Sequence, residues 1–421
     1  MNGTPLHHMV RIRTTDDLTF VRAGMMDEII VNANQLENSP RSTAAALRQT
    51  TLPFAVDPVL YRFQLPAWWR NDTGNTKRNY ARLGKAYVEG TDIAIADGPL
   101  LETVPNDKAW RTLAANVLHY QQDRLLDMPA QLDLLEESHY RELNPSRLMA
   151  PALVAFSSAE DCINRLLAEA SADASDGGIA LPVIVPFERL TDERELCSLL
   201  ATVPTDGVGS YFVWTPQVPE ELLLQDHEVF EAVLRLIGGL AERGIPVGHL
   251  HSGYVIAALH GLGVSAVVHH LGWVDKGEPA GQTRGGMRSC QVYVPGVRHC
   301  VRFDQAVELG RDLDAGAYVE RFCECGFCVG ALAEGQHPLD LLLEDQYVPY
   351  EGGRRGRRTP TGRAVGVHTW HYLLSRRLEI QAFSTRPAVE VIDRDMERAA
   401  ALSGNRDTDR LERLASELRS A

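Results

Sequence analysis

The sequence predicts an α/β fold whose parallel strands alternate with helices and close into a (β/α)8, TIM-like barrel. Two observations support this prediction. Short β-branched runs recur along the chain up to residue 270, with helical patterns between them. The runs between 181 and 270 begin at intervals of roughly 20 to 35 residues, which is the period of such a barrel. An open, doubly wound sheet shows the same alternation, so the periodicity leaves closure of the sheet undecided.

The predicted strands are rich in Val, Ile, Phe and Tyr and are bounded by Pro, Gly or polar residues. In chain order they are MVRIRT (9–14), LPFAVDP (52–58), ALVAFSS (152–158), LPVIVPF (181–187), SYFVWT (210–215), IPVGHL (245–250) and VSAVVHH (264–270). One amphipathic helix is expected between 215 and 245, because apolar residues recur there at helical spacing and Gly244 precedes Pro246. A short helix over 252–260 leads into the last strand.

After residue 300 the alternation of strand and helix patterns ends, and we divide the chain into three parts. Residues 1–310 form the predicted catalytic barrel, and 311–383 form a subdomain with a cysteine cluster and an arginine-rich insert. Residues 384–421 are charged and have the pattern of a surface or capping helix pair. No segment is rich enough in Pro, Gly or Ser to link autonomous domains.

Composition narrows the classes of function. With 44% hydrophobic and 23% charged residues, the chain is typical of a globular protein. Its 56 acidic and 42 basic residues give a net charge of −14, which excludes a generally basic nucleic-acid-binding surface but not a local basic patch. The first residues lack the apolar core of a signal peptide, and no stretch reaches the about 18 apolar residues of a membrane span. We therefore expect a cytoplasmic protein with reduced cysteines and no membrane partner.

Three of the seven cysteines lie in the segment FCECGFC (322–328), spaced C-x-C-x-x-C. This spacing can direct the thiolates of Cys323, Cys325 and Cys328 at one Zn²⁺, which takes a fourth N or S ligand in a structural site. The histidines that follow are His337, His368 and His371. The alternatives are a buried cluster without metal and a C-x-x-C redox pair, although the βαβ start of a thioredoxin-like motif is missing.

A barrel followed by C-x-C-x-x-C and then by a helix that starts with His resembles the tRNA-guanine transglycosylases. The resemblance is greater to their DNA-acting relatives, the 7-deazaguanine DNA transglycosylases and the related DNA glycosylases of phage defence. It covers about 50–330 and the cysteine motif, but not the last 35 residues. It implies a structural zinc ion held by Cys323, Cys325, Cys328 and His368, the first His of VHTWHYLLSRRLEI. Thr369 stands where the family usually has Asn.

The resemblance also implies a catalytic aspartate at the end of an early barrel strand, where barrel enzymes hold their catalytic groups. Asp57, followed by Pro58, ends the second predicted strand. The family's usual Ser-Gly-Gly-Phe-Gln is absent after it, and the Tyr61 and Arg62 that follow look more like the DNA-acting branch. Asp57 would act as the nucleophile or as the group that stabilises charge on the sugar. The alternative is an Asp that caps the following turn.

The family's second aspartate has no counterpart, since Val268 stands near its expected place in GVSAVVHHLGWVDKGE (263–278). Cleavage of an N-glycosidic bond needs a carboxylate for the oxocarbenium-like sugar and an acid for the leaving base. His270 or Asp275 is expected to supply the acid, and either is equally compatible with a packed, hydrogen-bonded residue. The groups expected to bind the substrate are Tyr61, Trp214, His249, His251 and Glu278.

Two segments are candidates for contact with nucleic acid. The insert EGGRRGRRTPTGR (351–363) is strongly basic in an acidic chain, and its arginines are suited to phosphates. In WWRNDTGNTKRNY (68–80), aromatic side chains adjoin cations and are suited to stacking on an extruded base. A solvated loop and a buried Trp pair are the respective alternatives. The residues assigned to this role are Arg354, Arg355, Arg357, Arg358, Trp69 and Arg70.

Together these features predict an enzyme that cleaves the N-glycosidic bond of a modified nucleobase in DNA, rather than tRNA, and leaves an abasic site. The family's guanine-reading Gln-Gly-Gly is missing after the middle strand, which argues against guanine in a tRNA loop. Base exchange and a catalytically inactive nucleic-acid-binding module are alternatives, and a homodimer is left open. A further alternative is a metal-dependent barrel hydrolase with ligands His249, His251, His269 and His270.

Overall fold

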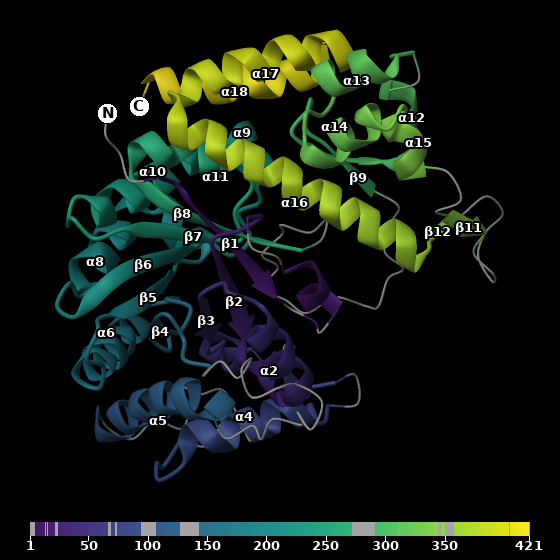
Figure 1. Ribbon diagram of the computed structural model, residues 1–421. Coiled ribbons are helices and arrows are strands. Elements are labelled where there is room, and N and C mark those ends of the chain that lie inside the picture. The colour runs from purple at the N-terminus through teal and green to yellow at the C-terminus, as the bar shows by residue number, and fades with distance from the viewer. Residues whose placement is uncertain are drawn as a thin grey trace.

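Eight parallel strands form a nearly closed barrel in the computed structural model of the chain (Figure 1). Their spatial order is β3-β2-β1-β8-β7-β6-β5-β4, so neighbours in sequence are neighbours in space. A parallel bridge between Ala55 and Arg147 joins the two edge strands β3 and β4. The structure describes residues 5–12, 14, 16–21, 24–65, 69–71, 74–93, 107–126, 143–271, 291–310, 312–343, 347–349, 358–403 and 405–420.

The barrel strands agree with the predicted parallel α/β barrel, and the bridged edges exclude an open doubly wound sheet. The strands are buried: on β2, for example, every residue is buried, Glu28 and Asn32 included. The bounds are β1 (His7–Ile12), β2 (Glu28–Asn32), β3 (Phe54–Asp57), β4 (Leu148–Met149), β5 (Ile179–Ile184), β6 (Val208–Trp214), β7 (Val247–Leu250) and β8 (Val264–His270).

Two strands differ from the sequence prediction. Strand β2, with the short sequence EIIVN, was not expected at all. The run predicted at 152–158 is not a strand, and β4 lies just before it and is only two residues long. Pro151 has no N–H to donate to a sheet ladder, which interrupts regular pairing. The segment still runs along β5, since Ala150 N donates to Ala180 O at 2.8 Å and Ala155 N donates to Ile184 O at 2.9 Å.

Helices follow the strands and cover the barrel (Figure 1). The single helix predicted between 215 and 245 is two helices, because the Asp226 side chain accepts from Glu228 N at 3.0 Å and starts a second helix there. The bounds are η1 (Asp16–Phe20), α1 (Ala33–Asn38), α2 (Pro40–Gln49), η2 (Leu60–Gln64), α4 (Arg78–Val88), α5 (Asp107–Leu126), α6 (Ser158–Asp173), α7 (Phe187–Thr191), α8 (Glu193–Thr202), α9 (Glu220–Gln225), α10 (His227–Ala241), α11 (Tyr254–Ala258) and η5 (Leu259–Leu262). Among the described helices, none has the length and apolar composition needed to cross a membrane.

The rest of the chain packs beside the barrel around one long helix, α16 (Gly362–Thr385). Figure 1 shows α16 running diagonally between the barrel and the group α12 to α15, with α17 and α18 lying along one side. Helix α16 contacts β1 and α11 of the barrel as well as β9, α14, α15 and α17. The bounds are β9 (Gln291–Val294), β10 (His299–Arg302), α12 (Phe303–Gly310), α13 (Ala315–Arg321), α14 (Gly326–Ala333), α15 (Pro338–Leu343), β11 (Tyr347–Pro349), β12 (Arg358–Pro360), α17 (Ala388–Ser403) and α18 (Asn405–Ser420).

A buried network of charges joins these parts, and we call it the junction network: Tyr254, Arg298, Arg376, Glu379 and Asp395. Arg298, in the β9–β10 turn, donates from Nη1 to Glu379 Oε1 at 2.7 Å and from Nε to Asp395 Oδ2 at 2.8 Å. Tyr254 of the barrel donates to Asp395 Oδ2 at 2.6 Å, and Arg376 Nη1 donates to Glu379 Oε2 at 2.7 Å. All five side chains are buried. The network therefore connects the barrel, the hairpin, α16 and α17.

Removing Arg298 should strongly destabilise the fold. The substitution Arg298→Ala leaves Glu379 and Asp395 buried with one guanidinium, Arg376, instead of two. Breaking a buried pair from one side costs roughly 3–5 kcal/mol, because the partner charge stays desolvated. The measurement is the free energy of unfolding from denaturant titration followed by circular dichroism.

The matched control is Arg419→Ala, which removes an exposed ion pair to Asp393. Exposed pairs are worth about 1 kcal/mol or less, so this variant should unfold like the unmodified chain. Equal losses in the two variants would contradict the role assigned to the junction network.

Candidate active site and metal centre

Polar side chains gather at the carboxyl ends of four consecutive barrel strands. Asn32 is the last residue of β2 and pairs in register with Asp57, the last residue of β3. On the other side, Arg11 of β1 pairs in register with His270, the last residue of β8. The carboxyl ends of the strands are where barrel enzymes position catalytic groups. The structure thus brings the predicted residues Asp57 and His270 to one end of the barrel.

Arg11 is the central residue of this end and was not singled out from the sequence. Its side chain is fully buried. One Nη2 donates to the Asp57 carboxylate and, at 2.7 Å, to the Tyr61 hydroxyl oxygen, and Nε donates to Asn32 Oδ1 at 2.8 Å. The sequence signal was a charged residue inside the otherwise apolar strand MVRI, because a buried guanidinium requires a partner.

Asp57 is held in one orientation by three donors. Oδ1 accepts from Val59 N at 2.9 Å, and Oδ2 accepts from Arg11 and from the Tyr61 hydroxyl, the latter at 3.1 Å. Val59 has φ of 51°, a left-handed conformation that is strained for a β-branched residue. Burial raises the pKa of Tyr61 to about 12, so its hydroxyl is a hydrogen-bond donor at neutral pH. Asp57 is therefore an oriented carboxylate with a matched positive charge.

His251 and His270 form an imidazole pair beside Arg11. His251 Nδ1 lies 2.7 Å from His270 Nε2, and its Nε2 lies 3.4 Å from Arg11 Nη1. The ring of His251 also packs against Trp214, with centroids 4.9 Å apart. His251 has φ of 61°, a second strained position at the same end of the barrel. We call Arg11, Asn32, Asp57, Tyr61, His251 and His270 the mouth network.

His251 is the partly exposed member of the imidazole pair, whereas His270 is buried. Burial lowers the pKa of His251 well below its usual range, and the neighbouring His270 and Arg11 lower it further. A neutral imidazole can accept a proton or donate an N–H hydrogen bond. The pair therefore places acid–base chemistry next to the Asp57 carboxylate.

The four histidines predicted as an alternative metal site do not converge. Successive strand residues face opposite sides, so His269 points away from His270. It lies outside the barrel wall, with its Nε2 2.5 Å from His8 Nε2 and its ring edge-on to Tyr372 of α16. His249 is buried and makes no hydrogen bond with a described side chain. Among the described residues, these histidines form no ligand cluster.

The predicted nucleic-acid contacts have different outcomes. Trp69 is fully buried and donates from Nε1 to Phe63 O at 3.2 Å, so it belongs to the core and is not available to stack on a base. The Arg70 guanidinium lies over its ring at 4.7 Å. Arg354, Arg355 and Arg357, the side chain of Arg358, and the predicted site residues Asp275 and Glu278 lie outside the described residues.

Three cysteines and one histidine form a compact cluster at the junction of α14 and α16. The ligand atoms of Cys323, Cys325, Cys328 and His371 all lie within 4.8 Å of one another, and all four side chains are buried. Among the described residues neither ring nitrogen of His371 has a hydrogen-bond partner. Buried polar atoms are rarely left in this state, and a metal ion would satisfy one of them. The donor set is compatible with a structural zinc site.

The electrostatics of the cluster also favour a cation. Burial opposes a charge on His371, but the negative charge of Cys323 and Cys325 outweighs it and raises the pKa of His371 to about 10. The thiol of Cys325 has a pKa lowered by hydrogen bonds from Cys323 and Cys328. The same surroundings that hold a proton on His371 would hold a divalent metal in its place.

The fourth member of the cluster is His371 and not His368, the ligand expected from the sequence. Helix α16 begins at Gly362, six residues before His368, so this histidine does not open the helix. His368 Nε2 lies 2.9 Å from the carbonyl oxygen of Leu342 in α15. Three residues further on, the helix has turned by about 300°, and His371 faces the cysteines. The rotation of α16, which the sequence does not reveal, decides between the two.

Buried neutral histidines predict a loss of stability in acid. Burial lowers the pKa of His249 to about 4 and that of His269 to about 3, and it also lowers the pKa of His8 and His251. Unfolded histidines bind protons below about pH 6.5 while these stay neutral in the folded chain, so the free energy of unfolding falls as the pH drops from there towards about 4. The expected slope is about 1.4 kcal/mol per pH unit for each histidine.

Denaturant unfolding measured between about pH 7.5 and 5 tests this slope. His249→Gln should reduce the slope by the contribution of one histidine, about 1.4 kcal/mol per pH unit. His119→Gln changes a side chain that is 76% exposed and should leave the slope unchanged. Comparison of the two variants isolates His249 from any loss of metal in acid. An unchanged slope in His249→Gln would contradict the assignment.

No protein-family model matches the chain, and a search of the curated proteins finds no match.

Proposed function

We propose that the protein cleaves the N-glycosidic bond of a modified nucleobase in DNA and leaves an abasic site. The observation that supports this most is the mouth network, in which Arg11 contacts both the oriented carboxylate of Asp57 and the imidazole of His251. Hydrolysis of an N-glycosidic bond needs a carboxylate and a proton-transfer group at one place. The resemblance to the DNA-acting relatives of the tRNA-guanine transglycosylases points to the same reaction.

In this proposal a flipped nucleotide enters the carboxyl end of the barrel. The C1′–N bond breaks, and its electron pair leaves with the base. Asp57 stabilises the positive charge that develops on the sugar and does not form a covalent bond to it. Its Oδ2 already accepts hydrogen bonds from Arg11 and Tyr61, which makes that oxygen a poor nucleophile. Water adds to C1′, and the proton that it loses passes through His251 to the leaving base. His270 orients His251 through their hydrogen bond.

Base exchange is the second candidate, because it uses the same carboxylate with an incoming base in place of water. A nucleic-acid-binding module without activity is the third. In each of these three candidate functions, the arginine-rich insert binds the phosphates of the nucleic acid. The insert includes β12, which pairs with β11 in antiparallel register, and it ends in the first turn of α16.

We further propose that Cys323, Cys325, Cys328 and His371 hold one structural Zn²⁺ and that this region is a zinc-binding subdomain. Four protein ligands would complete the coordination of a structural zinc ion, which would leave no position for a catalytic water. Cys325 caps α14 and Cys328 lies in its first turn, whereas His371 comes from α16. The metal would therefore link α14 to α16 and carry no step of the reaction.

Activity is tested on single- and double-stranded DNA that carries a panel of modified bases, with free base measured by mass spectrometry and abasic sites by alkaline cleavage. We expect release of one or more bases and the formation of abasic sites. Asp57→Asn and His251→Gln should each reduce the rate by about 100-fold or more, the usual contribution of such groups. His119→Gln on the exposed surface is the control.

Incorporation of an added base without abasic sites would replace hydrolysis by exchange. Full activity in Asp57→Asn would overturn the proposed role of the mouth network. DNA binding without turnover of any base, unchanged by Asp57→Asn, would leave only the binding module. His251 is partly exposed, so His251→Gln still tests the role of the mouth network if Asp57→Asn fails to fold.

Metal content distinguishes the two histidines of α16. Elemental analysis of the purified chain should find one zinc ion per molecule. His371→Ala should lose it and melt at a lower temperature, because structural zinc contributes directly to folding. His368→Ala should keep the metal, since His368 bonds to a carbonyl oxygen instead. Retention of zinc in His371→Ala together with its loss in His368→Ala would contradict the assigned ligand set.

A further inference from the structure

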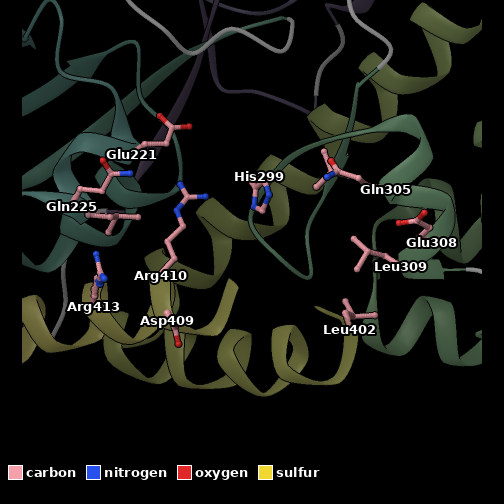
Figure 2. Close-up of a pocket in the computed structure, with 12 residues that line it drawn as sticks. Glu221, Gln225, His299, Gln305, Glu308, Leu309, Leu402, Asp409, Arg410 and Arg413 are labelled. Carbon is pink, nitrogen blue, oxygen red and sulfur yellow. The ribbon is translucent and has the colours of Figure 1, made fainter. Parts of the chain in front are cut away.

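A cavity of about 770 Å³ lies outside the barrel, away from the mouth network. Its walls come from α9 of the barrel, from β10 and α12, and from α17 and α18 (Figure 2). It therefore lies between the part formed by residues 1–310 and the C-terminal helices. Ligand sites commonly measure about 300–1,000 Å³ and lie between structural units.

One end of the cavity carries two arginines. Arg410 and Arg413 lie three residues apart on α18, so they share a face of that helix. In Figure 2 Arg410 extends from α18 into the space between Glu221 and His299, whereas Asp409 points away. Neither arginine has a hydrogen bond or an ion pair with any described residue. Glu221 and Asp409 are the carboxylates that line this end, and Asp409 points away from the space that Arg410 enters.

A third acid, Glu220, interacts with Arg410 but forms no ion pair with it. Its Oε1 accepts a hydrogen bond from Ile256 N at 3.3 Å. Arg410 is half-buried, which makes an unpaired guanidinium costly in this position. An anionic group bound between Arg410 and Arg413 would satisfy both, since guanidinium groups favour phosphate and carboxylate oxygens.

The opposite end of the cavity has different chemistry. Helix α12 contributes the amide of Gln305 and the carboxylate of Glu308, and Leu309 and Leu402 add apolar surface beside them (Figure 2). Gln305 Oε1 already accepts from Arg302 N at 3.1 Å and has one further lone pair, so the Glu308 carboxylate is the main acceptor for ring N–H and amino groups. The leucines cover the faces of a flat ring. This end is complementary to a nucleobase that carries such donors.

We propose that this cavity binds a mononucleotide, with its phosphate on Arg410 and Arg413 and its base towards Gln305 and Glu308. The proposal does not depend on the function proposed for the barrel mouth, because none of these residues belongs to the mouth network. A bound nucleotide would contact the barrel and α17–α18 together, so its binding should stabilise the folded chain.

Binding is tested with the full chain by calorimetry and by thermal unfolding, using GMP and AMP as probes. Guanosine and adenosine test the need for the phosphate, and inorganic phosphate tests the need for the base. We expect at least one nucleotide to bind and to raise the melting temperature, and its nucleoside and inorganic phosphate to bind about tenfold more weakly or worse. Arg410→Gln and Arg413→Gln should each weaken nucleotide binding by about tenfold or more.

The matched control is Arg419→Gln, on the same helix but outside the cavity, where Arg419 pairs with Asp393. It should bind like the unmodified chain. Arg413 is exposed, so its variant tests the proposal even if Arg410→Gln is unstable. Binding of neither nucleotide at millimolar concentration, binding of inorganic phosphate as tight as that of the nucleotides, or full binding in Arg413→Gln would overturn the proposal.

Discussion

The arrangement of the chain depends on two carboxylates that cannot remain buried alone. Glu379 of α16 and Asp395 of α17 are fully desolvated, and Arg298 and Arg376 neutralise them. Because a buried charge without its partner costs several kcal/mol, the hairpin turn and both helices are constrained to meet beside the barrel. The three clustered cysteines belong to the same continuous apolar cluster as barrel residues, so the two regions share a core.

The same constraint organises the barrel mouth. Arg11 is buried in an apolar strand, and Asp57 matches its charge from two strands away. Two residues beside this pair, Val59 and His251, have left-handed backbones that are unfavourable for their side chains. Such strain persists when the surroundings over-determine it, and it is typical of sites where orientation matters more than stability. The pair thus serves both the fold and the proposed chemistry.

The sequence allowed the α/β class, most of the strands and the three cysteines to be predicted, because hydrophobic runs and cysteine spacing are local signals. It missed β2, which is only five residues long and has no strong flanking turn signal. It missed Arg11, whose role appears only when β1 lies between β2 and β8. His368 was expected as the metal ligand because the start of α16 was placed too late in the sequence. Trp69 was expected to contact nucleic acid because a pattern of adjacent aromatic and cationic residues does not reveal which of them are buried.

By itself, the sequence determined which chemistry the chain contains: a three-thiolate motif, an aspartate at a strand end and histidines on two late strands. The tertiary structure decided which of these groups meet. His371 faces the cysteines through the rotation of α16, and His270 and His269 separate to opposite faces of one strand. The pairing of β1 and β3 with the strand between them, β2, brings Arg11 to Asp57 over 46 positions of sequence. Side-chain direction and long-range contact depend on packing, which local sequence patterns do not encode.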